Sequence, residues 1–300
     1  MQISLAWWNT SLAPIGRKSE ASAESRAVAG GLTHLLANDL GFDLIALAEV
    51  SLKEIDAMRS TFIFDGFEFI EHFESAGRTT FDLCTIYRSS KLRLLDRQAL
   101  TIRKGSRNFK LGQQMEFQMA GSTKPLHFIA SHWPSRLWTE QDHSDRHLLG
   151  IRLRDVVDAI LTNDPEALIV LAGDYNDEPF DRSLSEQLMA TRDKSLVAAR
   201  PQLLYNPFWR YLCYSHDAVE TDTGPRLAGT YFHSGGACTQ WRTFDQIIFS
   251  SGLTSGTNWE LDESRTLVLN VPTYSELVTS SSHQFDHLPV TSVIRMRQNG

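Results

Sequence analysis

A six-residue apolar run that ends in a polar tetrapeptide constrains the fold of this chain more than any other feature. Residues 167–172 read Ala-Leu-Ile-Val-Leu-Ala, and Gly173-Asp174-Tyr175-Asn176 follows directly. A continuous apolar run of this length, bounded by turn residues, is typical of a strand that is covered on both faces. Because ligands gather beyond the carboxyl ends of such strands, we expect Asp174 and Asn176 at the floor of a cleft. The alternative is an Asx turn that only closes the strand.

The same pattern, an apolar strand with a polar side chain at one end, recurs along the chain. Residues 43–48 run into Glu49, residues 126–130 run into Ser131-His132, and Asp245 begins another apolar stretch. Independent surface turns would rarely place so many carboxylate, amide and imidazole groups at strand edges. In chain order, the residues at predicted strand edges are Asn9, Glu49, His132, Asp174, Asn176, Asp245, Asp286 and His287.

The order of these motifs resembles that of the endonuclease/exonuclease/phosphatase superfamily, the group related to DNase I and to abasic-site endonucleases. The resemblance covers nearly the whole chain. It implies a four-layer α/β/β/α sandwich with two stacked mixed sheets. It rests on Trp8-Asn9, Ala48-Glu49, residues 131–136, Gly173-Asp174-Tyr175-Asn176, Thr243-Phe244-Asp245-Gln246 and Phe285-Asp286-His287, with Gly229-Thr230-Tyr231-Phe232 similar to the family's substrate-side strand.

One position departs from the family pattern. The superfamily usually has Ser before the final Asp-His pair, and this chain has Phe285. Loss of that hydroxyl is expected to change the hydrogen bonding around Asp286 or the substrate specificity. Both presumed catalytic side chains, Asp286 and His287, are retained.

The spacing of apolar residues predicts the remaining architecture. Residues 20–38 and residues 142–161 show helical periodicity. Residues 82–87 and residues 91–101 are typical of an antiparallel hairpin. Strands mixed with helices in this way favour two central sheets with helices outside. No linker rich in Pro, Gly or Ser divides the chain, so we expect a single domain over residues 1–300.

Composition argues against several classes of protein. No run approaches the roughly 20 apolar residues that span a bilayer, so we expect no transmembrane segment. Residues 1–6 lack a basic region, which favours a cytoplasmic location. Three cysteines without a Cys-x-x-Cys spacing indicate reduced thiols, not a disulfide framework or a thiolate zinc site. His143 and His147 lie four apart on a predicted helix, but no third zinc ligand is evident.

The chemistry of phosphate-ester cleavage assigns roles to the predicted site. The transition state gains negative charge on the phosphorus oxygens, and a hard divalent cation lowers that cost. Glu49 with Asp286 and Asn9 offers carboxylate and amide oxygens suited to Mg²⁺ or Mn²⁺. The attacking water must also be oriented and deprotonated, and we assign that role jointly to Asp174 and His287.

Further side chains are expected to support this chemistry. Asn176 would support the phosphate or the nucleophile. Asp245 would hold His287 and fix its tautomer. His132 is a second candidate for acid-base catalysis or phosphate binding. Similarity to the DNase I branch implies that Asp82 is its partner.

Four basic residues are candidates for substrate binding. Arg136 and Arg146 are predicted to bind phosphate oxygens. Lys104 and Arg107 belong to residues 103–110, a basic segment that suits either a loop along a phosphate backbone or a solvated hairpin tip. The net charge of -7 does not suit bulk electrostatic capture of nucleic acid, so such contacts would be local.

A metal-dependent nuclease that acts on DNA more than on RNA is the leading functional interpretation. The pairing of His132 with His287 and the aromatic residues 205–211, which suit base stacking or core packing, favour it. The alternatives are a small-molecule phosphatase, a sphingomyelinase-like lipid phosphodiesterase and a catalytically weak binding or regulatory module. A calcineurin-type enzyme would need a downstream Gly-Asn-His segment, which the sequence lacks. The oligomeric state and a regulatory protein partner stay open.

Overall fold

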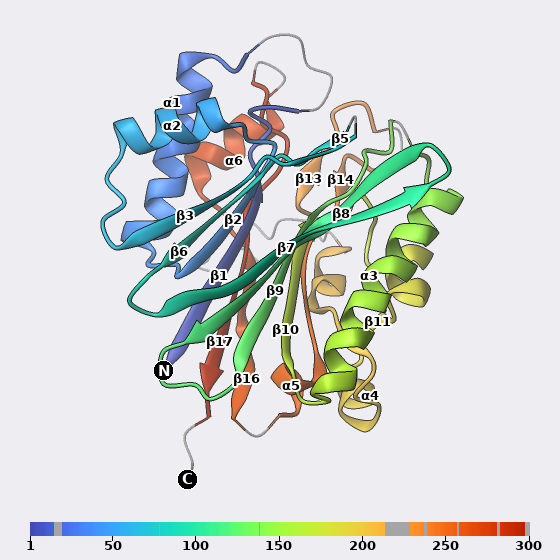
Figure 1. The fold of residues 1–300 in the computed structure, drawn as a ribbon. Helices are drawn as coiled ribbons and strands as arrows, with labels where there is room; N and C mark the ends of the chain where they lie inside the picture. Colours follow the sequence, from blue (N-terminus) through green and yellow to red (C-terminus); the bar gives the residue numbers. More distant parts are fainter. Residues whose placement is uncertain are drawn as a thin grey trace.

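The computed structural model describes the chain except for residues 15–19, 78, 138, 214–228, 237–238, 257, 281–282 and 298–300. Two large mixed sheets lie at its centre, and helices cover their outer faces (Figure 1). The expected four-layer sandwich is confirmed. Of the three cysteines, Cys84 is buried and free, Cys213 is exposed and free, and Cys238 lies outside the described residues.

The first sheet has six strands in the order β16-β17-β1-β2-β6-β3. Its central pair, β1 and β2, runs parallel, and the other neighbouring strands are antiparallel. The strands are β1 (Gln2–Asn9), β2 (Leu44–Ala48), β3 (Phe67–His72), β6 (Leu83–Arg88), β16 (Trp259–Val268) and β17 (Val290–Met296).

The second sheet has seven strands in the order β11-β12-β15-β10-β9-β8-β7. β9 and β10 run parallel at its centre. The strands are β7 (Leu92–Lys104), β8 (Arg107–Met119), β9 (Pro125–His132), β10 (Leu168–Asp174), β11 (Ala190–Thr191), β12 (Leu204–Tyr205) and β15 (Asp245–Phe249). Two small ribbons, β4 (Ser75–Ala76) with β5 (Thr79–Thr80) and β13 (Tyr231–Phe232) with β14 (Trp241–Arg242), flank the sheets.

Helices form the outer layers (Figure 1). The first sheet is covered by α1 (Ala23–His34), which continues into η1 (Leu35–Asp39), and by α2 (Leu52–Thr61) and α6 (Pro272–Thr279). The second sheet is covered by α3 (Ser144–Asn163), with η2 (Ser183–Gln187), α4 (Lys194–Ala199), η3 (Pro207–Tyr211) and α5 (Ser251–Thr254) around it. Both helices expected from periodicity are present.

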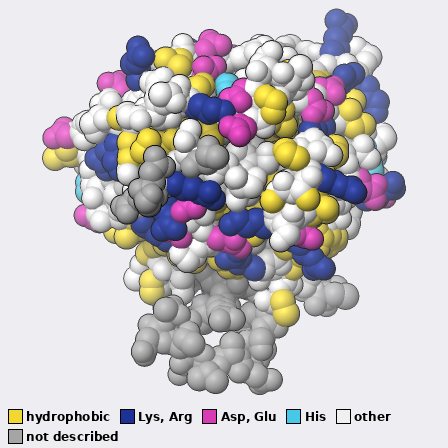
Figure 2. All heavy atoms as spheres, turned by 90° about the horizontal axis from the view of Figure 1, so that it is seen from below, with side chains coloured by type: hydrophobic (Ala, Val, Ile, Leu, Met, Phe, Trp, Pro, Cys, Tyr) yellow, Lys and Arg dark blue, Asp and Glu magenta, His cyan; other side chains and the backbone are white. Residues whose placement is uncertain are grey.

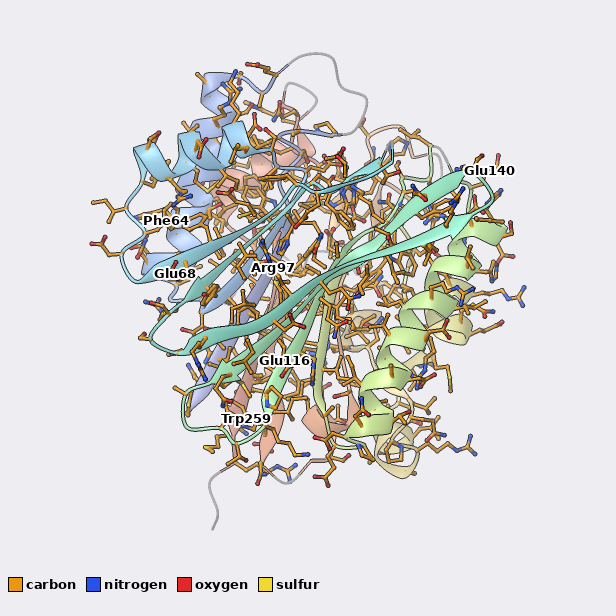
Figure 3. The ribbon with its side chains drawn as sticks, viewed as in Figure 1. Phe64, Glu68, Arg97, Glu116, Glu140 and Trp259 are labelled. Atoms are coloured by element: carbon orange, nitrogen blue, oxygen red, sulfur yellow. The ribbon has the colours of Figure 1, made fainter. Side chains whose placement is uncertain are left out.

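Buried side chains from both sheets form one core cluster, which includes Trp7, Phe128 and Val170. Figure 3 shows the space between the sheets filled with side chains. A second cluster lies between α3 and the outer face of the second sheet. The aromatic segment contributes to packing, because Tyr205 and Phe208 are buried in the first cluster.

The hairpin predicted from residues 82–87 and 91–101 is wrong. β6 pairs with β2 and β3 in the first sheet, whereas β7 pairs with β8 in the second. Both hydrogen-bonding edges of β6 are therefore in use, and none is left for β7. The chain crosses from one sheet to the other through residues 89–91.

The actual hairpin joins β7 and β8, and its tip is the basic segment. Lys104 pairs with Arg107 across a two-residue turn, in which Gly105 has a φ of 61°. Both side chains form ion pairs with Asp145 in the first turn of α3, at 2.6 and 3.2 Å. The hairpin-tip interpretation of residues 103–110 is thus supported.

The end of the sandwich from which β1 starts carries a mixed surface. Viewed from below, Lys and Arg side chains alternate there with Asp, Glu and hydrophobic side chains (Figure 2). None of the described helices combines the length and the hydrophobicity that a membrane-spanning helix needs.

Candidate active site

Strand alternation directs the polar residues at the strand ends into the space between the sheets. In β10 the even-numbered residues belong to the core between the sheets, whereas Ile169 and Leu171 pack on the α3 side. Because successive side chains alternate between faces, Asp174 continues the row that faces the first sheet. The same count places His132 of β9 and Asp245 of β15 on that face.

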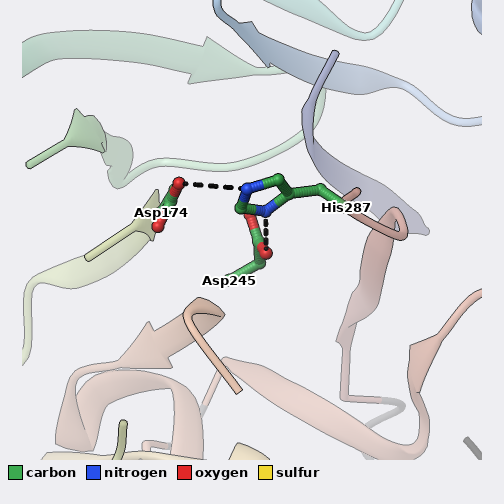
Figure 4. A group of neighbouring side chains, drawn as sticks. All are labelled: Asp174, Asp245 and His287. Carbon is green, nitrogen blue, oxygen red and sulfur yellow. Dashed lines mark hydrogen bonds and ion pairs between the residues drawn. The ribbon is translucent and has the colours of Figure 1, made fainter. Parts of the chain in front are cut away.

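His287 lies between two carboxylates (Figure 4). Its Nδ1 is 2.7 Å from Asp245 Oδ2, and its Nε2 is 3.7 Å from Asp174 Oδ2. Burial lowers the pKa of His287, but the charges of Asp245 and Asp174 outweigh it and raise that pKa well above its ordinary value. Trp7 Nε1 donates to the other oxygen of Asp245 at 2.9 Å, which fixes the carboxylate.

A second histidine–carboxylate pair faces the first. His132 Nδ1 is 2.8 Å from Asp82 Oδ2, and its Nε2 lies 3.9 Å from Asp174 Oδ2. Lys110 donates to the other oxygen of Asp82 at 2.5 Å. Burial raises the pKa of Asp82, but His132 and Lys110 outweigh it and hold that pKa well below its usual range. The Asp82 partnership expected from resemblance is present.

Asp174 is the point on which these groups converge. Its Oδ2 accepts a hydrogen bond from Asn9 Nδ2 at 3.0 Å, and its Oδ1 accepts one from the Asn176 backbone N–H at 2.9 Å. Burial raises its pKa, and the nearby His287 partly offsets this effect. The two histidines thus approach one buried carboxylate through their Nε2 atoms.

Glu49 and Asp286 lie at the rim of this arrangement. Burial raises the pKa of the Glu49 carboxyl to about 7, His132 and His287 oppose this, and the charge of Asp286 adds to it. Within the described part of the chain no hydrogen bond to the Glu49 carboxylate is found, and its Oε1 is 3.7 Å from His132 Nε2. Asp286 accepts a hydrogen bond from Ser11 Oγ at 2.5 Å.

Three residues of the site have a left-handed backbone that non-glycine residues rarely adopt. Ser11, Glu49 and Asn176 have φ values of 52°, 53° and 50°. All three line the same cavity. Such strain persists only where the surrounding structure enforces it, and it concentrates at functional sites.

The donor set suits a divalent cation. Glu49 is a half-buried carboxylate without a hydrogen-bond partner in the described chain, and a second carboxylate, Asp286, raises its pKa further. A hard cation would relieve that repulsion. Asp174, Asp245 and His287 also have ligand atoms within 4.8 Å of one another, but the hydrogen bond between His287 and Asp245 already occupies Nδ1. Asn9 Oδ1 accepts from the Ser11 backbone N–H, so Asn9 positions Asp174.

A cavity of about 870 Å³ opens onto these groups. Its lining includes the acidic and histidine residues of the site, among them Glu49, Asp174 and His287. It also includes residues of the β7–β8 hairpin, among them Arg107 and Lys110. Its size is within the range of small-molecule and cofactor sites.

The other predicted basic residues lie outside the lining of this cavity. The Arg146 guanidinium is buried, pairs with Asp177 at 3.3 Å and donates to the Pro134 carbonyl at 2.9 Å. Arg136 donates to the Asn176 carbonyl at 2.8 Å. Both arginines therefore hold the loop that follows β10. Lys104 pairs with Asp145 and does not line the cavity. Of the four basic residues predicted to bind substrate, Arg107 is the one that lines it.

Phe285 supports the site by packing. Its side chain is buried and contacts the ring of Tyr274, with ring centroids 5.3 Å apart. The Tyr274 hydroxyl donates to the His287 carbonyl at 2.9 Å and accepts from Trp8 Nε1 at 3.1 Å. The Ser11 hydroxyl, not one at position 285, is the donor to Asp286.

Two site residues were missed by sequence reasoning. In the sequence, Lys110 is only the end of a basic segment, although its alternation with Phe109 on a strand distinguishes it from the hairpin surface. Ser11 carried no signal, because a left-handed serine after a strand is not readable from composition.

Comparison with known proteins defines the class of this chain. A sequence model of the Endonuclease/Exonuclease/phosphatase family matches residues 26–267. Among curated proteins, none matches the chain in sequence. The match spans most of the chain, so the protein belongs to the endonuclease/exonuclease/phosphatase family and is a phosphoesterase of that superfamily.

Solved structures with the same fold differ in what they act on. The human Nocturnin catalytic domain with bound sulfate has a TM-score of 0.60 at 15% identity, covering 99% of this chain and 95% of that one. D. rerio TDP2 in complex with a single-strand DNA product has a TM-score of 0.60 at 16% identity, covering 98% and 99%. The mannosyl-6-phosphatase Bt3783 of Bacteroides thetaiotaomicron has a TM-score of 0.59 at 13% identity, covering 99% and 100%. At these identities the likeness extends to the fold alone.

Proposed function

We propose that this protein is a metal-dependent phosphodiesterase that hydrolyses nucleic acid, DNA more than RNA. The observation that carries the proposal is the convergence of two histidine–carboxylate pairs on Asp174, with Nε2 distances of 3.7 and 3.9 Å. A phosphodiester has a poor alkoxide leaving group, so its hydrolysis needs one group that activates water and another that protonates the leaving oxygen. Two opposed histidines supply both.

Each side chain has a role in this reaction. Asp174 and His287 orient and deprotonate the attacking water. The raised pKa makes His287 the stronger base, and in its neutral form Asp245 selects the tautomer whose Nε2 accepts the proton. His132, held by Asp82, donates a proton to the leaving oxygen. Glu49 and Asp286 would hold Mg²⁺ or Mn²⁺, which when bound stabilises negative charge on the phosphate oxygens.

Several groups act by positioning. The Asn9 side-chain amide donates a hydrogen bond to Asp174, and the Asn176 backbone N–H donates one to the same carboxylate. The Arg136 guanidinium donates a hydrogen bond to the Asn176 backbone carbonyl and so holds Asn176 in place. Arg107 at the cavity edge is a candidate contact for the polynucleotide backbone.

A phosphatase for sugar phosphates is the second candidate. The cavity of about 870 Å³ would accommodate such a substrate. The fold of a mannosyl-6-phosphatase is similar to that of this chain. Hydrolysis rates on mannose 6-phosphate and on single-stranded DNA, measured with Mn²⁺, separate the two: a nuclease cleaves the DNA and leaves the sugar phosphate largely intact.

Substitution of His132 by Ala tests its assignment as the leaving-group acid. The variant is expected to lose about 10²-fold or more in kcat on DNA, because an alkoxide must be protonated as it leaves. It should lose far less on a p-nitrophenyl phosphodiester, whose phenolate leaves without a proton. Steady-state kinetics on both substrates make the comparison. Equal losses on both would assign His132 to another step.

Substitution of Glu49 by Gln tests the metal site. Removing one anionic ligand should raise the Mg²⁺ concentration for half-maximal activity by about tenfold or more. Direct Mn²⁺ binding, measured by electron paramagnetic resonance, should weaken in parallel. Glu54→Gln is the matched control. Glu54 lies on α2, pairs with Arg26 at 3.4 Å and does not line the cavity. Unchanged Mn²⁺ affinity in Glu49→Gln would remove Glu49 from the site.

A further inference from the structure

Lys110 is a buried cation that the proposed chemistry does not use. Its side chain is 8% exposed and lines the cavity from β8. An ammonium group has three N–H donors. Within the described chain, Asp82 is the one acceptor found for Lys110 Nζ, at 2.5 Å. Two donors therefore remain for a group that enters the cavity.

Leaving those donors without a partner would cost free energy. Buried polar groups are almost always hydrogen-bonded, and a buried charge needs anionic partners most of all. Asp82 is shared, because its other oxygen binds His132 at 2.8 Å. An anionic oxygen of a ligand would complete the coordination of Lys110, and the charge-assisted bond would be stronger than one between neutral groups.

The strand that carries Lys110 is anchored on both sides of it. The Asn108 carbonyl accepts from Thr79 Oγ1 at 3.0 Å, which ties β8 to the β4–β5 ribbon. At the hairpin tip, Lys104 and Arg107 both pair with Asp145. A cation on an anchored strand, already hydrogen-bonded to Asp82, loses less conformational entropy when it binds an anion than a free surface lysine does.

Side chains of both charges line the cavity. Glu49, Asp174 and Asp286 contribute carboxylates, and Lys110 and Arg107 of the β7–β8 hairpin contribute cations. A single phosphate bound beside Glu49 and Asp286 would leave the remaining donors of Lys110 without an anionic partner other than Asp82. A substrate with two phosphates in series would place the second one against Lys110.

We propose that Lys110 forms an anion subsite on the hairpin wall, which binds a phosphate neighbouring the one that is cleaved. This inference rests on the proposed function in one respect: if the protein is a nuclease, the anion bound by Lys110 is a phosphate of a polynucleotide. The subsite would select substrates with consecutive phosphates over simple monoesters. Lys110 thus acts on the substrate directly, in addition to its hydrogen bond with Asp82.

Phosphate binding tests the subsite without any need for turnover. The probe is inorganic phosphate, titrated in the presence of a chelator, with the melting temperature as readout and sodium chloride of equal ionic strength as reference. The proteins are the parent chain, Lys110→Met, Lys110→Arg and Lys124→Met. Lys124 pairs with Asp164 at 2.8 Å just before β9 begins, so it is a matched ion-paired lysine far from the cavity.

The expected result is saturable phosphate binding by the parent, weakened about tenfold or more in Lys110→Met, as the loss of one charge-assisted hydrogen bond requires. Lys110→Arg should restore most of the affinity, and Lys124→Met should match the parent. If Lys110 only balances Asp82, Lys110→Met would lose stability yet bind phosphate as the parent does. That result, or the absence of saturable binding in the parent, would overturn the proposal.

A kinetic arm separates this inference from the proposed function. A dithymidine with a 5′-phosphate offers two consecutive phosphates, and unphosphorylated dithymidine offers one. The parent should prefer the first in kcat/KM, and Lys110→Met should lose that preference. If neither is cleaved although phosphate binds through Lys110, the nuclease assignment fails and the subsite stands.

Discussion

Replacing Asp174 by Asn is expected to reduce kcat by about 10³-fold or more while the fold is retained. The amide has the shape of the carboxylate, but it cannot accept a proton or carry the charge on which both histidines converge. Burial already raises the pKa of Asp174, so removal of its charge should leave the melting temperature unchanged or higher. Steady-state kinetics and thermal unfolding measure the two effects.

Asp177→Asn is the matched control, three residues along the same loop. Asp177 is equally buried and pairs with Arg146 at 3.3 Å, outside the cavity lining. Breaking that buried pair should cost about 3 kcal/mol of stability. The folded fraction should keep most of its activity. If Asp174→Asn instead lost stability and activity in parallel, as a structural residue would, Asp174 would not be the catalytic carboxylate.

Replacing Asp245 by Asn is expected to have a comparable effect through the histidine. Its Oδ1 would still accept from Trp7, but its amide N–H would face His287 Nδ1 and force the proton onto Nε2. His287 could then no longer accept a proton from water through Nε2. An Asp-to-Asn change of this kind in a serine-protease triad lowers kcat about 10⁴-fold with intact geometry, and we expect a loss of about 10³-fold or more.

Nuclear magnetic resonance of the histidine side chain provides the readout specific to this mechanism. In the parent the proton on Nδ1 should give a downfield signal, and in Asp245→Asn that signal should disappear. A variant that keeps the Nδ1 proton and still loses activity would contradict the tautomer argument. Full activity in the variant would remove Asp245 from the mechanism.

The strand ends could be predicted from the sequence because burial leaves a strong local signal. The apolar run before Asp174 and the one before Glu49 both became central strands. Their period of two then fixes the face to which the terminal side chain points. The convergence of residues as distant as Asn9 and Asp174 followed from resemblance, because no local pattern encodes which strands are neighbours.

The parts that could not be predicted depend on long-range pairing. Residues 91–101 resemble the partner of the preceding strand, yet they belong to the other sheet, since both edges of β6 are occupied. Arginine is a residue type that commonly binds phosphate, but tertiary packing buries Arg146 against Asp177. Lys110 becomes part of the site only because the hairpin brings β8 beside Asp82.

Incubation of the parent and Asp174→Asn with plasmid DNA, single-stranded DNA and RNA, each with Mg²⁺, Mn²⁺ or chelator, tests the central claim most directly. The account predicts cleavage by the parent alone, only with metal, and faster on DNA than on RNA. Absence of cleavage of all three polymers, together with metal-dependent release of phosphate from mannose 6-phosphate, would contradict it.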